Sequence, residues 1–79
     1  MITRFALVGL DKPKSITCLV TRSKEVFCPK VDIEQDIFDD LFDYCINNWS
    51  ERKIAVVEHE GMKDDGTPKN PVLKNIEIL

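Results

Sequence analysis

Three cysteines and one histidine are the residues of this chain with the most varied chemistry: Cys18, Cys28, Cys45 and His59. Together they supply the ligand types of a Cys₃His zinc site. Structural zinc sites usually take two ligands from a close pair such as C-x₂₋₄-C, whereas the nearest cysteines here are ten residues apart. The spacing therefore argues against a metal site, and we expect none.

A nucleophilic enzyme needs a nucleophile beside a base, and the sequence offers Cys28 with His59 as such a pair. No motif surrounds either residue, and the three glycines form no phosphate-binding loop. Cys18 and Cys45 fall on the apolar faces of predicted elements, where a free cysteine behaves as a small core residue. We therefore expect a protein that is not an enzyme and that binds no cofactor.

A block of negative charge is the most informative feature of the sequence. Residues 31–51 contain seven acidic residues and no Lys or Arg, whereas residues 1–30 are net basic. At 100° per residue of a helix, four aspartates share a sector of about 100°: Asp36, Asp39, Asp40 and Asp43. Such a row is most often a solvated face, and its functional interpretation is a docking surface for a basic partner.

Two large apolar residues stand out beside this row: Ile46 falls on the polar side of the helix, and Trp49 lies at the helix end. Aromatic anchors are typical of interface hot spots, and also of ordinary core edges. The residues that we predict to contact a partner are Asp36, Asp39, Asp40, Asp43, Ile46 and Trp49.

The element that must position these residues is an amphipathic helix, expected from about Ile33 to Trp49. Asp32 is a good N-cap, and Gln35 follows it at the spacing of a capping box. The apolar arc of this helix is centred on Leu41, which predicts a helix laid on a sheet.

Strands are expected on both sides of the helix, at 2–10, 15–22, 25–28, 53–59 and 72–79, with turns at 11–14 and 23–24. The connection 60–71 is polar and contains Gly and Pro, which suits either a binding loop or a disordered one. We therefore predict an α+β fold of order β-β-(β)-α-β-β. Its antiparallel sheet has four or five strands, with the one amphipathic helix packed on one face.

Length and composition indicate one small folded domain, residues 1–79. The chain has 79 residues, of which 43% are hydrophobic and 32% are charged, and its net charge is −3. The apolar stretch at 5–10 is shorter than the core of a signal peptide or a membrane span. An odd number of widely spaced cysteines suits a reducing compartment. We therefore expect a cytoplasmic protein without membrane contact.

Two functions from different classes fit these features. The first is a small non-enzymatic inhibitor or adaptor, of the kind that phages and plasmids encode, whose acidic helix mimics DNA phosphates. It would occlude a basic or nucleic-acid-binding surface of a partner protein, and its acidic block would prevent direct binding of nucleic acid. The alternative is a structural module that self-associates, for instance as a homodimer, or joins a permanent complex through an edge strand or an apolar patch.

Overall fold

A curled sheet and a single helix make up the described part of the chain, residues 1–11 and 14–79 of the computed structural model. The fold is α+β, as predicted, and the elements follow one another in the order β-β-β-β-α-β-β. They are β1 (Ile2–Asp11), β2 (Ser15–Val20), β3 (Glu25–Phe27), β4 (Lys30–Val31), α1 (Gln35–Asn47), β5 (Lys53–Glu58) and β6 (Val72–Ile78).

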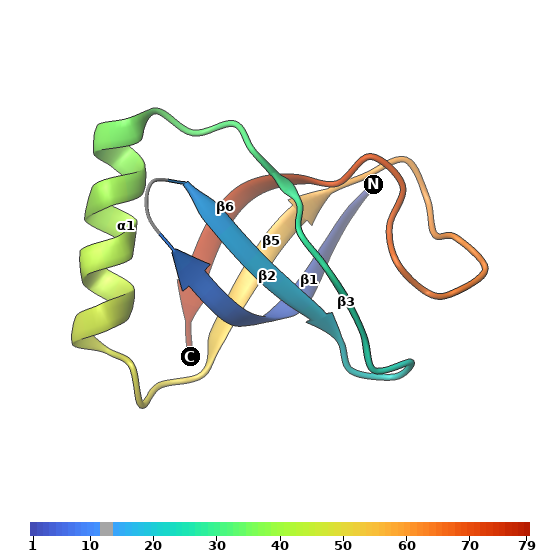
Figure 1. Ribbon diagram of the computed structural model, residues 1–79, viewed down its shortest axis with the longest axis horizontal. Helices are drawn as coiled ribbons and strands as arrows, with labels where there is room; N and C mark the ends of the chain where they lie inside the picture. Colours follow the sequence, from blue (N-terminus) through green and yellow to red (C-terminus); the bar gives the residue numbers. More distant parts are fainter. Residues whose placement is uncertain (12–13) are drawn as a thin grey trace.

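The strands pair in the spatial order β3-β2-β1-β5-β6-β4, antiparallel except for the parallel pair β4 and β6. Strand β5 returns after a long connection to lie beside β1, next to the meander of β1, β2 and β3, which is a Greek-key arrangement. The two edge strands, β3 and β4, are separated in the chain only by Cys28 and Pro29. Because two strands so close in the chain form opposite edges of the sheet, the sheet has to curl, and it forms a half-barrel (Figure 1).

Strand β1 connects the two halves of the curled sheet, because different parts of it pair with two different strands. Residues 2–6 pair with β5 and residues 6–11 with β2, and Ala6 faces both Ile54 and Leu19. A β-bulge lies between Leu7 and Gly9. A Cβ on Gly9 would lie 3.2 Å from the Cβ of Thr17, so glycine allows the two strands to approach closely where β1 bends.

The core fills the concave side of the sheet. It includes Phe5, Ile16, Val57 and Leu73 from the strands, all of them buried. The ring of Phe5 meets that of Phe27 edge to face, with centroids 4.9 Å apart. Helix α1 stands at one end of the curled sheet, and the 59–71 segment extends from the opposite end (Figure 1).

The predicted helix boundaries were wrong at both ends. The helix begins at Gln35 rather than Ile33, and Glu34, not Asp32, is the N-cap residue, without a side-chain capping bond. The carbonyl of Ile33 instead accepts a hydrogen bond from Nζ of Lys14, at 2.6 Å. A hydrogen bond from a distant residue is thus present where a local capping box was expected.

The helix also ends two residues earlier than predicted, at Asn47 rather than Trp49. The backbone N–H and the side-chain amide of Asn48 both donate to the carbonyl of Tyr44, at 3.1 and 2.8 Å. These two bonds satisfy a terminal carbonyl and turn the chain out of the helix. Trp49 therefore lies beyond the helix.

The strand predictions were close: the ends of β1, β3, β5 and β6 differ by one residue each, and two differences are larger. Strand β4, two residues long, was not predicted, and β2 ends at Val20 rather than at Arg22. The carbonyl of Val20 accepts the N–H of Lys24, whose φ is 65°, and this tight turn ends the ladder early. The turn expected at 11–14 has its central residues, 12 and 13, outside the described residues.

The 59–71 connection, named here the arm, contains the 60–71 segment that was expected to be either a binding loop or a disordered one, and hydrogen bonds across it give it a regular structure. Backbone N–H groups of Glu60 and Lys69 bond across it to Lys69 and Gly61, at 3.0 and 2.8 Å. Asp65 accepts bonds from the backbone and hydroxyl of Thr67, at 2.9 and 2.5 Å, and Pro68 is fully buried. The arm is thus a twisted extension of the β5–β6 hairpin.

Candidate functional site

The outer face of α1 carries the predicted aspartates, and the helix holds them rigidly. Phe38 and Cys45 on its inner side have no exposed surface and belong to the core. On the opposite side, Asp36, Asp40 and Asp43 are exposed. Because the buried side fixes the rotation of the helix, these carboxylates point into solvent in a fixed row.

The fourth aspartate, Asp39, is partly buried and accepts a hydrogen bond from Nε2 of Gln35, at 2.9 Å. Helix α1 itself contains no Lys or Arg. Within residues 1–11 and 14–79, no cation lies within ion-pair distance of any of the four aspartates. The row is therefore an uncompensated negative surface, made stronger by the like charges at three- and four-residue spacing.

The structure keeps Ile46 on this surface and separates Trp49 from it. Ile46 lies on α1 and is 49% exposed. Trp49 lies past the helix end, where Nζ of Lys53 stands 4.6 Å from its ring centroid and donates to its carbonyl at 2.7 Å. The same amine donates to the carbonyl of Glu51, at 2.9 Å. The six predicted contact residues thus fall on two surfaces, five on α1 and one beside β1.

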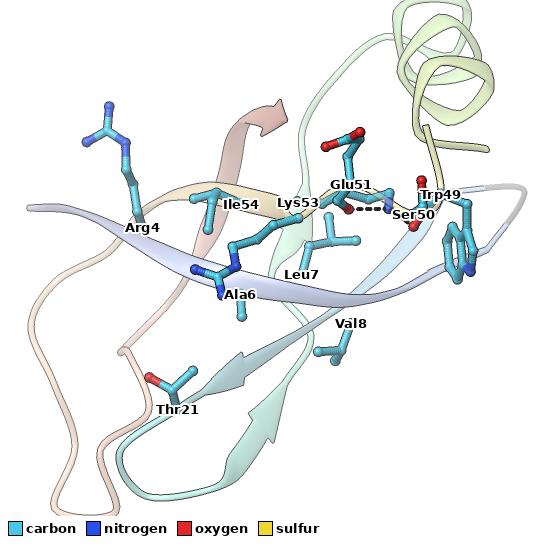
Figure 2. Close-up of a pocket in the computed structure, with 11 residues that line it drawn as sticks. Arg4, Ala6, Leu7, Val8, Thr21, Trp49, Ser50, Glu51, Lys53 and Ile54 are labelled. Carbon is cyan, nitrogen blue, oxygen red and sulfur yellow. Dashed lines mark hydrogen bonds between the residues drawn. The ribbon is translucent and has the colours of Figure 1, made fainter. Parts of the chain in front are cut away.

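Trp49 lines an open groove of about 700 Å³ between β1 and the 49–54 segment. Figure 2 shows Arg4 and Trp49 at opposite ends of this groove, with Val8 nearer to Trp49. The guanidinium of Arg4 bonds to Glu77, with Nε 2.8 Å from Oε1. The polar side chains that line the groove belong to Arg4, Thr21, Ser50, Glu51, Arg52 and Lys53.

A second groove of about 430 Å³ runs between α1 and β6. This groove was not expected, because the apolar arc centred on Leu41 also includes Ile37 and Tyr44 and predicts that both are covered. Both side chains are about half exposed, Ile37 at 51% and Tyr44 at 53%. The residues that line this groove are Asp32, Ile33, Glu34, Ile37, Leu41, Lys74 and Asn75.

The cysteines divide into two buried thiols and an exposed one. Burial and, to a smaller degree, the neighbouring Cys28 together raise the pKa of the Cys18 thiol to about 12. Burial likewise raises the pKa of Cys45, against a smaller opposing effect of Lys53. Both thiols are core residues, as the sequence suggested. Cys28 is exposed, with its sulfur 3.7 Å from Oγ1 of Thr17.

His59 is buried and its ring nitrogens are engaged. Nε2 lies 2.8 Å from Oγ1 of Thr3, and Nδ1 accepts the backbone N–H of Gly61 at 3.1 Å. The imidazole thus braces the start of the arm against β1. Among the residues that the structure describes, no group of three or more His, Cys, Asp or Glu side chains is arranged to hold a metal ion.

No protein-family model matches the chain, and no curated protein or solved structure is significantly similar to it. None of the helices in the described residues is long and apolar enough to cross a membrane.

Proposed function

We propose that this protein is a non-enzymatic binding protein that covers a basic surface of a partner protein with the outer face of α1. The observation that carries the proposal is the row formed by Asp36, Asp40 and Asp43, exposed on a helix that Phe38 and Cys45 anchor in the core. A partner that brings Lys or Arg side chains to this row supplies the missing counter-charges.

Charge of this kind acts mainly on recognition and on the rate of association. Complementary potentials steer partners together and reject those of like charge. A fixed row of carboxylates also resembles the phosphates of a nucleic acid, so a protein that binds DNA or RNA is a suitable target. An inhibitor of such a protein would work by occlusion, without chemistry of its own.

Direct binding of a single-stranded oligonucleotide is the second candidate, and the fold favours it. Some small, partly open Greek-key barrels bind oligonucleotides or oligosaccharides on their sheets. Here the groove of Figure 2 places the exposed Trp49 along β1, with Arg4 and Arg52 also in its lining. Stacking on an aromatic ring beside cations is how such proteins hold single strands, although a fold alone does not fix a function.

Self-association through a sheet edge finds less support in the geometry. The edge strands β3 and β4 have three and two residues. Pro29, which lies between them, has no N–H to donate to an added strand. These short edges offer little template for a second copy.

The experiment compares two baits that differ only in where charge is removed. The test variant D36N/D40N/D43N neutralises the row on α1, and the control variant D11N/E25Q/D64N removes the same charge from exposed positions elsewhere. Each bait and the wild type are used to capture proteins from a cell lysate, and each captured protein is then purified and titrated.

We expect a basic protein that binds the wild type and the control, and that binds D36N/D40N/D43N at least tenfold more weakly, about 1.4 kcal/mol. Equal binding by both variants would refute the proposal. Binding of a single-stranded oligonucleotide that Trp49→Ala abolishes would establish the second candidate instead.

A further inference from the structure

The groove between α1 and β6 combines an apolar floor with an acidic rim. Ile37, Leu41 and Tyr44, named here the α1 stripe, are separated by four and three residues, so they lie on one side of the helix. Leu41 is partly buried, whereas Ile37 and Tyr44 are about half exposed. Ile37 and Leu41 line the groove of about 430 Å³, and Tyr44 continues their side of the helix about one turn further on.

The charges around the groove are mostly negative, although Nζ of Lys14 lies at the carbonyl of Ile33. Asp32 and Glu34 line it, and Asp36 and Asp40 lie on the exposed side of α1 next to the stripe. The groove's cation, Lys74, is already paired with Glu58, with Nζ and Oε2 3.1 Å apart. An occupant of this groove therefore meets apolar side chains and carboxylates that lack counter-ions among the described residues.

The spacing of the stripe suits a helix as the occupant. Seven residues of α-helix rise about 10.5 Å, so a partner helix with apolar residues three and four apart keeps in step with Ile37, Leu41 and Tyr44. Side chains on one face of a strand recur every ~6.8 Å and match the stripe less well. A second copy of α1 would place aspartates against aspartates, which is repulsive.

We propose that the α1–β6 groove binds an amphipathic α-helix of the partner protein, with its apolar stripe on Ile37, Leu41 and Tyr44 and with Lys or Arg side chains along its flanks. This inference rests on the proposed function, because it specifies what part of the basic partner reaches α1. The groove is the observation behind this inference, and the carboxylates determine only the charge expected of the occupant.

The test uses two synthetic peptides of about 14 residues, four turns of helix. One arranges Leu and Lys so that the leucines form a helical stripe, and the other has the same composition in scrambled order. Both therefore carry the same charge. They are titrated into the full-length protein by calorimetry, and circular dichroism records helix formed on binding.

Two single variants locate the binding. Ile37→Ser removes an exposed apolar group from the stripe, and Val26→Ser removes one from β3, where Val26 is 59% exposed. We expect the striped peptide to bind the wild type at least about tenfold more tightly than the scrambled one. Ile37→Ser should lose that preference, and Val26→Ser should keep it. Unchanged melting temperatures confirm that both variants fold.

Several results would overturn the inference: equal affinity for both peptides, no binding of the striped peptide, or an Ile37→Ser variant that binds like the wild type. Sedimentation that shows a dimer lost in Ile37→Ser would make a second copy the occupant and overturn it too. If both peptides bind equally and D36N/D40N/D43N weakens both, the groove assignment fails while the proposed function stands. If D36N/D40N/D43N weakens neither, the proposed function fails with it.

Discussion

Two aromatic residues of α1 test which side of the helix is buried. Phe38 has no exposed surface, whereas Tyr44 is 53% exposed. Replacing a fully buried Phe by Ala costs about 3–5 kcal/mol, and a surface substitution usually stays within ~0.5 kcal/mol. Both substitutions gain about the same helix propensity, so this contribution cancels in the comparison. We therefore predict that Phe38→Ala is more destabilising than Tyr44→Ala by about 3–5 kcal/mol.

The size of this loss sets the assay. A domain of this length has a net stability of about 3–5 kcal/mol, so Phe38→Ala should be largely unfolded at room temperature. Phe38→Leu keeps most of the side-chain volume and should cost roughly 1–2 kcal/mol, which leaves a measurable transition. Urea denaturation followed by far-UV circular dichroism then compares Phe38→Leu, Tyr44→Ala and the wild type. A Tyr44→Ala variant destabilised as much as Phe38→Leu would refute the assignment of the buried side.

Three further predictions concern charge, thiols and the arm. D40N/D43N removes three like-charge pairs on α1, so it should stabilise the fold by up to ~1 kcal/mol at low salt, and the gain should shrink as salt is added in thermal melts. An alkylating reagent at neutral pH should modify Cys28 alone in the native protein, with the buried Cys18 and Cys45 labelled only after unfolding; mass spectrometry counts the adducts. Hydrogen bonds from Thr67 lower the pKa of Asp65, so the ionised carboxylate stabilises the arm at neutral pH, and this contribution is lost as the pH falls below about 4. The protection factors of the arm amides, taken relative to the intrinsic exchange rate at each pH, should therefore fall in acid, and Asp65→Ala should abolish that dependence.

The strands and the helix could be predicted because their signals are local. Alternating or continuous apolar runs give β1, β2, β5 and β6, and the helical period gives α1. Strand β4 could not be predicted, since its two residues are a strand only through parallel pairing with Val72 and Leu73, about 40 residues away. The same holds for the helix start, where the contact between Lys14 and Ile33 outweighs the capping signal of Asp32.

The regular structure of the arm could not be predicted from its turn residues alone. Asp64 and Asp65 followed by Gly66 indicated a turn, but nothing in the polar composition indicated a burial of Pro68 or a bridge between Met62 and Pro68. The arm also lies close to the β2–β3 turn, since a Cβ on Gly66 would lie 3.1 Å from Oγ of Ser23. A contact between two distant turns is a tertiary property, which the sequence pattern of either turn does not reveal.

The candidate site was predictable in its charges and not in its apolar part. The helical projection placed Asp36, Asp40 and Asp43 on the polar side, and they are exposed. The same projection centred the buried arc on Leu41, whereas the fully buried residues are Phe38 and Cys45, about 50° further around the helix. The rotation of the helix about its own axis is set by its packing against the curled sheet, and it leaves Ile37 and Tyr44 exposed.

Because of this rotation, part of the apolar surface of the helix remains outside the core. A helix that packs on one side needs an apolar stripe of about 100°, and the apolar residues of α1 span a wider arc. Single exposed apolar residues are ordinary, but Ile37 lines a groove, Tyr44 lies on the same side of the helix, and nearby carboxylates lack counter-ions among the described residues. An oligonucleotide would neither cover the exposed apolar side chains nor neutralise the carboxylates, whereas a cationic amphipathic helix would do both. The decisive observation is therefore whether Ile37→Ser and D36N/D40N/D43N weaken the binding of one and the same ligand.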